Sequence, residues 1–123
     1  MKSNGLRNRF SQDELCSAWA FHYKCLWCGK GGFDCFHHIK SPSSSNYKDG
    51  SFNKSILNSY PIHNFGCHLY NSELHKPENE SRMLKEVLRI LLREDYTLKE
   101  RDKKFMSVYS DCYEGFTSLD KRG

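Results

Sequence analysis

Apolar residues recur every three or four positions between Glu80 and Asp95, which is the most regular pattern in the chain. This spacing places them on one side of an α-helix. The apolar positions are Met83, Leu84, Val87, Leu88, Leu91 and Leu92, and the charged residues Lys85, Glu86, Arg89 and Arg93 fall on the opposite, solvent side. We therefore predict an amphipathic helix here whose apolar side packs on the core.

Two capping boxes predict further helices. Ser11-Gln-Asp-Glu14 places a hydroxyl and a carboxylate where they satisfy the first free N–H groups of a helix that runs to about Tyr23. Thr97-Leu-Lys-Glu100 repeats the pattern and predicts a highly charged helix that continues through about Ser107.

Two short strands are predicted between these helices. Residues 33–39 show the two-residue alternation of a strand, and residues 55–63 form a second candidate, in which Pro61 favours a sheet edge. The Ser-rich residues 41–51 between them have the composition of a loop. A short helix is expected over residues 68–75, and the Lys76-Pro77 pair after it is predicted to end that helix.

These elements together predict an α+β fold. We expect one domain over residues 1–123, because a chain of this length can bury one modest core but not two. Within it, residues 1–24 form a basic arm and a helix, residues 25–75 form the core, and residues 76–123 form a C-terminal helical extension.

The charge balance changes this picture only slightly. The chain has 19 Lys and Arg against 15 Asp and Glu, a net charge of +4, which mildly favours an anionic partner. The first ten residues lack the apolar stretch of an export signal, and no apolar run reaches membrane-spanning length. We therefore expect a cytoplasmic protein without membrane association.

Cysteine and histidine spacing predicts a metal site. The chain has six Cys, and Cys25 and Cys28 are spaced C-x2-C, which suits a single tetrahedral zinc ion. His63 and Cys67 are the candidates for the other two ligands, with Cys35 as the alternative for one of them. The two cysteines that have no such neighbours, Cys16 and Cys112, are expected to be small buried apolar residues.

A second candidate site involves His37 and His38, which are adjacent at the end of a predicted strand and so point to opposite faces unless the strand ends there. The order C-x2-C, His-His-Ile, a loop, Asn58-x-x-Pro-Ile and then Cys-His68 resembles the HNH branch of the His-Me finger (ββα-metal) endonucleases. The resemblance covers Cys25 to about His75.

The resemblance implies a role for each matching residue. It implies a zinc-stapled ββα-metal core in which His38 is the general base, Asn58 braces the loop and the base, and His37 and His68 hold a catalytic divalent ion such as Mg²⁺ or Mn²⁺. Zinc-bearing members usually have a Cys where this chain has His63. Compact nucleases of this kind are common on phage genomes and mobile elements, so the cytoplasm would be that of a bacterial host.

Hydrolysis of a phosphodiester bond requires the same residue types. An imidazole with an ordinary pKa of ~6.5 suits the removal of a proton from water near neutral pH. An ion held by few protein groups keeps open positions for phosphate oxygens. We therefore expect a DNA endonuclease or nickase. Its contacts with the phosphate backbone of DNA are expected to come from Lys30, Lys40, Lys48 and Lys54.

A second function remains open. The same scaffold could serve as a non-catalytic zinc module that binds nucleic acid or a protein partner. Cleavage of plasmid DNA distinguishes the two functions. The apolar side of the helix over residues 80–95 could pack against the N-terminal helix or against a second copy, and we expect a monomer.

Overall fold

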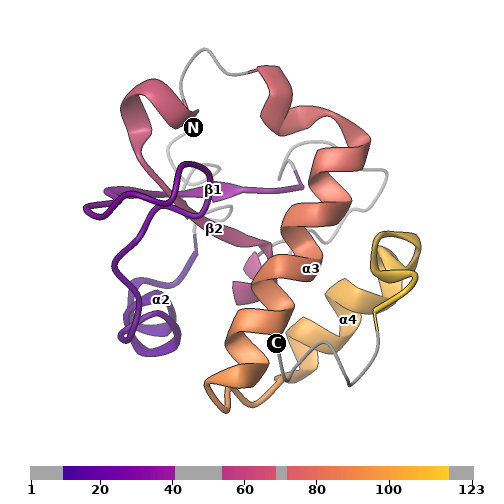
Figure 1. Cartoon of the computed structure of the whole chain (residues 1–123). Coiled ribbons are helices and arrows are strands. Elements are labelled where there is room, and N and C mark those ends of the chain that lie inside the picture. The colour runs from indigo at the N-terminus through magenta and orange to yellow at the C-terminus, as the bar shows by residue number, and fades with distance from the viewer. Residues whose placement is uncertain (1–9, 41–53, 69–71, 117–123) are drawn as a thin grey trace, which may run out of the picture.

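The computed structural model describes residues 10–40, 54–68 and 72–116. Within these residues, the helices are α2 (Gln12–Ala18), α3 (Pro77–Arg93) and α4 (Glu100–Val108); the strands are β1 (Cys35–His38) and β2 (Ser59–Ile62); and the short turns are η2 (Ile56–Asn58), η3 (Asn64–His68), η4 (Ser72–His75) and η5 (Ser110–Tyr113). The arm before Phe10 and the whole predicted loop over residues 41–51 lie outside these residues. The predicted α+β fold is confirmed, with a two-stranded antiparallel sheet and several helices consistent with a small ββα-type core (Figure 1).

The second strand is shorter than the pattern predicts. Its first part instead forms the 3₁₀ turn η2, where the hydroxyl of Ser55 accepts a hydrogen bond from the N–H of Leu57 at 3.0 Å. On the outer edge of β2, the carbonyl of Pro61 accepts a bond from the N–H of Leu26 at 3.0 Å. The segment that carries the C-x2-C pair therefore covers part of an edge that would otherwise present unpaired backbone groups.

The two faces of the sheet pack against different helices. His38 pairs with Ser59 across the strands, and Ser59 accepts a hydrogen bond at 2.9 Å from the indole N–H of Trp19, the residue that follows α2. His37 pairs with Tyr60, whose hydroxyl donates to Glu86 of α3 at 3.0 Å. Adjacent residues of β1 thus face α2 and α3 in turn.

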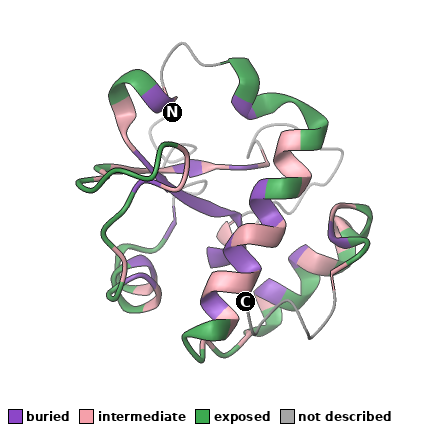
Figure 2. Ribbon diagram, in the orientation of Figure 1, coloured by how far each residue is buried: buried purple, intermediate pink, exposed green. Residues whose placement is uncertain are grey.

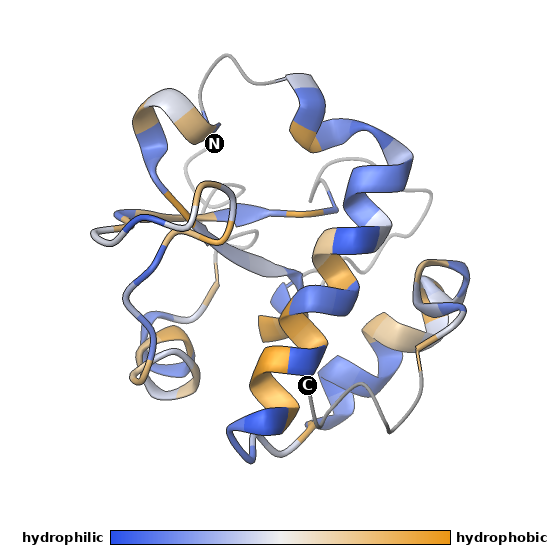
Figure 3. Cartoon of the chain, in the orientation of Figure 1, coloured by the Kyte–Doolittle hydropathy of each residue, from blue (hydrophilic) through white to orange (hydrophobic). Residues whose placement is uncertain are grey.

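Helix α3 supplies more buried apolar residues than any other described element, as its apolar pattern predicts. Its buried residues are Met83, Leu84, Val87, Leu88 and Leu91, whereas Leu92 is only partly buried. The buried and apolar positions lie along the side of α3 that faces the strands (Figures 2 and 3). Two predictions need correction. Glu86 is half-buried against Tyr60 rather than on the solvent side. Helix α3 begins at Pro77 rather than at about Glu80, because proline suits the first helical turn. The turn η4 ends at His75, as the Lys76-Pro77 pair predicts.

The other two helices are shorter than predicted. The cap at Ser11 is present, with its Oγ atom 3.3 Å from the N–H of Glu14, but α2 ends at Ala18 because the chain turns there to bury Trp19. Helix α4 begins at Glu100 rather than Thr97, because the buried carboxylate of Asp102 accepts the backbone N–H of Lys99 at 2.9 Å.

Candidate metal centre and histidine cluster

The C-x2-C pair forms a tight turn. The N–H of Cys28 points at the sulfur of Cys25 from 3.4 Å, and the N–H of Gly29 donates to the carbonyl of Cys25 at 2.8 Å. Gly29 has a φ of 83°, which glycine adopts without a steric cost. Both sulfurs therefore face the same side of the turn.

The two predicted ligand pairs meet in space. The ligand atoms of Cys25, Cys28, His63 and Cys67 all lie within 4.8 Å of one another. Nδ1 of His63 is 3.4 Å from Sγ of Cys28 and 3.8 Å from Sγ of Cys67. Zinc at its usual bond lengths in a tetrahedral site separates sulfur and nitrogen ligands by roughly 3.5 Å. This Cys3His cluster could therefore hold a metal ion such as zinc.

The orientation of His63 suits metal binding. Its Nε2 atom is 2.9 Å from the carbonyl oxygen of Gly31, so Nε2 carries the hydrogen and Nδ1 presents its lone pair to the sulfurs. This hydrogen bond is the largest cause that raises the pKa of His63. A backbone group outside the cluster therefore selects the tautomer that can bind an ion.

The thiols of the cluster differ in acidity. A hydrogen bond with the Lys30 backbone is the largest cause that lowers the pKa of Cys28 to about 7, whereas burial raises the pKa of Cys67 to about 12. Without a cation, several thiolates at this spacing repel one another. Metal binding must therefore release protons, as it does at thiolate sites in general.

Cys35, the alternative ligand, lies outside the cluster. Its sulfur is 3.9 Å from Oδ1 of Asn64 and 4.0 Å from Nδ1 of His68, and burial raises its pKa. The two isolated cysteines also lie elsewhere. Cys112 is partly buried, but the prediction that Cys16 is a buried apolar residue is wrong, because its side chain on α2 is exposed.

Three histidines gather on the α3 side of the sheet. The ring centroid of His37 is 4.9 Å from that of His68 and 5.3 Å from that of His75. His37 is only 3% exposed, and burial lowers its pKa to about 3, with His68 and His75 as further causes. Nε2 of His37 is buried and has no hydrogen-bond partner among the described residues. The exposed His75 completes a histidine cluster that the sequence analysis did not assemble.

His38 lies on the other side of the sheet. Its ring stacks on Phe10 with centroids 4.0 Å apart and planes 10° apart, and it lines a hollow of about 540 Å³ between α2 and β1. Strand alternation therefore continues through His38. The structure brings His68 beside His37, and it places the ring of His38 on the α2 face.

Asn58 is completely buried and braces the chain just after His38. Its side chain accepts a hydrogen bond from the N–H of Lys40 at 2.7 Å and donates to the carbonyl of Lys40 at 3.1 Å. Both backbone groups of one residue are thus held by one amide. This arrangement fixes the path of the chain where β1 ends.

The four lysines predicted to contact DNA differ in their surroundings. Lys40 is bound to Glu80 at 2.9 Å and lies 5.1 Å from the ring centre of Tyr109, so its charge is already compensated within the chain. Lys30 is exposed beside the C-x2-C turn, and Lys54 is partly exposed. Lys48 lies outside the described residues.

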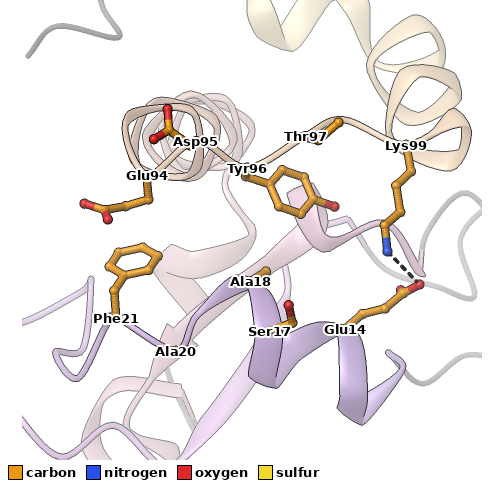
Figure 4. Close-up of a pocket in the computed structure, with 10 residues that line it drawn as sticks. All are labelled: Glu14, Ser17, Ala18, Ala20, Phe21, Glu94, Asp95, Tyr96, Thr97 and Lys99. Atoms are coloured by element: carbon orange, nitrogen blue, oxygen red, sulfur yellow. Dashed lines mark hydrogen bonds and ion pairs between the residues drawn. The ribbon is translucent and has the colours of Figure 1, made fainter.

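A second hollow, of about 490 Å³, lies away from these residues, between α2 and the connection from α3 to α4 (Figure 4). The exposed side chains of Phe21, Glu94 and Asp95 line it, and Glu14 at its edge binds Lys99 at 3.4 Å. It contains none of the predicted site residues.

The geometry defines a class: a small α+β protein with a Cys3His cluster that could hold a metal ion. Comparison of the chain with protein-family models, curated proteins and solved structures finds no match in any of the three. Within the part of the chain that the structure describes, every helix is too short or too polar to cross a lipid bilayer.

Proposed function

We propose that the chain is a metal-dependent DNA endonuclease or nickase of the HNH type, with zinc in the Cys3His cluster as a structural ion. The observation that carries the proposal is the approach of His68 to His37, whose buried Nε2 lacks a hydrogen-bond partner among the described residues. A nitrogen in that state is suited to bind an ion, since an unsatisfied buried polar group is otherwise costly.

The donor set fits a divalent ion. His37 and His68 would hold it, and the exposed ring of His75 is the nearest further imidazole. The depressed pKa of His37 keeps its ring neutral and able to bind a cation at neutral pH. When bound, such an ion would stabilise the negative charge that develops on phosphate oxygens.

The residues of the chain supply the remaining steps. We assign His38 as the base that takes a proton from the attacking water, and Asn58 as the residue that positions the backbone after it. The water oxygen bonds to phosphorus, the bond from phosphorus to the 3′ oxygen breaks, and that oxygen takes a proton from solvent water. The products are a 5′-phosphate and a 3′-hydroxyl end.

The net charge of +4, the exposed Lys30 and the partly exposed Lys54 support DNA as the partner, through contacts that depend on salt. One observation favours the alternative, a non-catalytic zinc module. The ring of His38 stacks on Phe10 on the face opposite His37, so catalysis requires His38 to leave that stack.

Plasmid nicking separates the two functions. Zinc-loaded chain is incubated with supercoiled DNA and Mg²⁺ or Mn²⁺, beside His37→Ala, His38→Ala and His75→Ala, with His22→Gln as a matched control outside the cluster. We expect the wild type and the control to nick, and His37→Ala and His38→Ala to lose at least about 100-fold, the usual contribution of a general base.

Two results would change this conclusion. If His75→Ala loses cleavage while His38→Ala retains it, the base lies on the α3 face and His38 has no catalytic role. If folded, zinc-loaded wild type cuts nothing with any divalent ion, the zinc-module function replaces the endonuclease.

A further inference from the structure

Phe65 is the most exposed large apolar residue in the described part of the chain, at 76%. It lies in η3, between His63 and Cys67 of the Cys3His cluster. Loop tips usually carry small or polar residues. A phenyl ring with this exposure buries little apolar area, so it contributes little to the stability of the fold. A binding partner would give the ring a role.

The loop holds Phe65 in place from both sides. The residue after Phe65 is Gly66, whose φ of 86° lets the chain reverse where other residues would be strained. The N–H of Asn64 donates to the carboxylate of Asp34 at 2.7 Å, and Oδ1 of Asn64 lies 3.2 Å from Nδ1 of His68. The ring is therefore displayed from an ordered backbone that the cluster and these bonds hold together.

Phe65 is also close to the histidine cluster. Only three peptide steps separate it from His68, so their Cα atoms are at most about 11 Å apart. A phosphate held beside His37 and His68 would then have its neighbouring nucleotide within reach of the ring, since bases of one strand follow one another at about 3.4 Å when stacked and farther apart when splayed.

A second aromatic ring borders the Cys3His cluster. Tyr23 is 66% exposed and packs against Gly31, the residue whose carbonyl binds His63. Lys24 lies 5.7 Å from the centre of the Tyr23 ring, and Lys30 is exposed on the same turn. Exposed aromatic rings and nearby cations are the elements that bind unpaired nucleic acid, through stacking on the bases and attraction to the phosphate backbone.

We propose that Phe65 stacks on an unpaired base next to the scissile phosphate, so that the substrate of the proposed nuclease is single-stranded or locally unpaired DNA. This inference rests on the proposed function, but it concerns binding and is measured without cleavage. A base in an intact duplex is already stacked on both sides. Stacking on Phe65 therefore favours the binding of DNA whose bases are unpaired and exposed.

The test is fluorescence anisotropy of labelled single-stranded and duplex oligonucleotides with zinc-loaded chain and no added Mg²⁺ or Mn²⁺. Phe65→Ala and Phe65→Leu are expected to weaken single-strand binding roughly 5- to 150-fold, the usual effect of losing one stacked base. Phe65→Trp is expected to retain binding, with its indole fluorescence quenched by the DNA. Zinc content and melting temperature must match the wild type in each variant.

Phe21→Ala is the matched control, because Phe21 is also exposed, at 41%, but lines the hollow away from the histidine cluster. Its single-strand affinity should equal that of the wild type. If Phe65→Ala or Phe65→Leu binds single strands as tightly as the wild type, the stacking role is wrong. If the wild type still nicks plasmid with Mg²⁺ or Mn²⁺ in that case, the proposed function survives and only this inference fails. A wild type that binds no DNA overturns both.

Discussion

Nε2 of His63 donates a hydrogen bond to the carbonyl oxygen of Gly31 at 2.9 Å, and this bond joins the two halves of the Cys3His cluster. Gly31 follows the C-x2-C turn, whereas His63 follows β2. The bond selects the His63 tautomer and sets its ring plane, so Nδ1 faces the thiols before any ion arrives. The cluster is therefore organised by backbone as well as by ligands.

Removal of the ion should destabilise the chain. We expect one zinc per chain, and we expect a chelator or Cys28→Ser to lower the melting temperature by roughly 10 °C or more, because binding energy at such sites is folding energy. Elemental analysis and thermal denaturation measure both. Cys16→Ser, which changes an exposed cysteine outside the cluster, should retain zinc. An equally stable metal-free chain would contradict a structural role for zinc.

The fourth ligand can be tested separately. His63→Ala should lose zinc, and His63→Cys should retain it, because a thiolate can replace the imidazole at the same position. Cys35→Ser should keep full zinc content, since its sulfur contacts Asn64 and His68 instead of the cluster. Zinc loss in Cys35→Ser together with retention in His63→Ala would assign the ligand to Cys35.

Asp102 should be essential for stability. Its buried carboxylate accepts hydrogen bonds from the hydroxyls of Ser55 at 2.6 Å and Tyr96 at 2.7 Å and from the backbone of Lys99 at 2.9 Å. Asp102→Ala leaves these donors without an acceptor and should lower the free energy of unfolding by about 3 kcal/mol. Urea denaturation measures this. The exposed Asp111→Ala is the control and should change it by less than about 0.5 kcal/mol.

Glu86 should make stability depend on pH. Burial raises its pKa above the ordinary 4.5, while Tyr60 donates to it. Between 4.5 and the raised pKa, the folded state binds more protons than the unfolded state, so the contribution of Glu86 to stability falls as pH rises. Glu86→Gln should therefore gain stability relative to the wild type between pH 4.5 and pH 7 in urea denaturation.

The comparison between variant and wild type cancels the effect of pH on zinc. Glu94→Gln removes an exposed carboxylate and is the control for the loss of one negative charge. A relative stability of Glu86→Gln that is the same at both pH values would show that burial does not hold a proton on Glu86.

Much of the architecture follows from local pattern. The three- and four-residue spacing of Met83 to Leu91 specifies both a helix and its buried side, because a helix must bury a continuous apolar stripe. The C-x2-C pair also has a local meaning, since one tight turn suffices to point two thiols the same way. The start of α3 was predicted at about Glu80 rather than at Pro77, because a proline that follows one helix can also open the next, where its missing N–H is not needed.

Other features depended on contacts between distant segments. The sequence by itself predicted the candidate ligands Cys25, Cys28, His63 and Cys67, with Cys35 as the alternative for one of them. The choice between His63 and Cys35 depended on how β1 and β2 pair, in a register that sets Cys35 opposite Ile62 and outside the cluster. The same register sends His37 to the α3 face, where it meets His68 and His75, and sends His38 to Phe10. Local residue types therefore determined which chemistry the chain carries, and only the tertiary structure decided which groups share a site, because side-chain direction in a strand is set by its pairing and by the helices that cover each face.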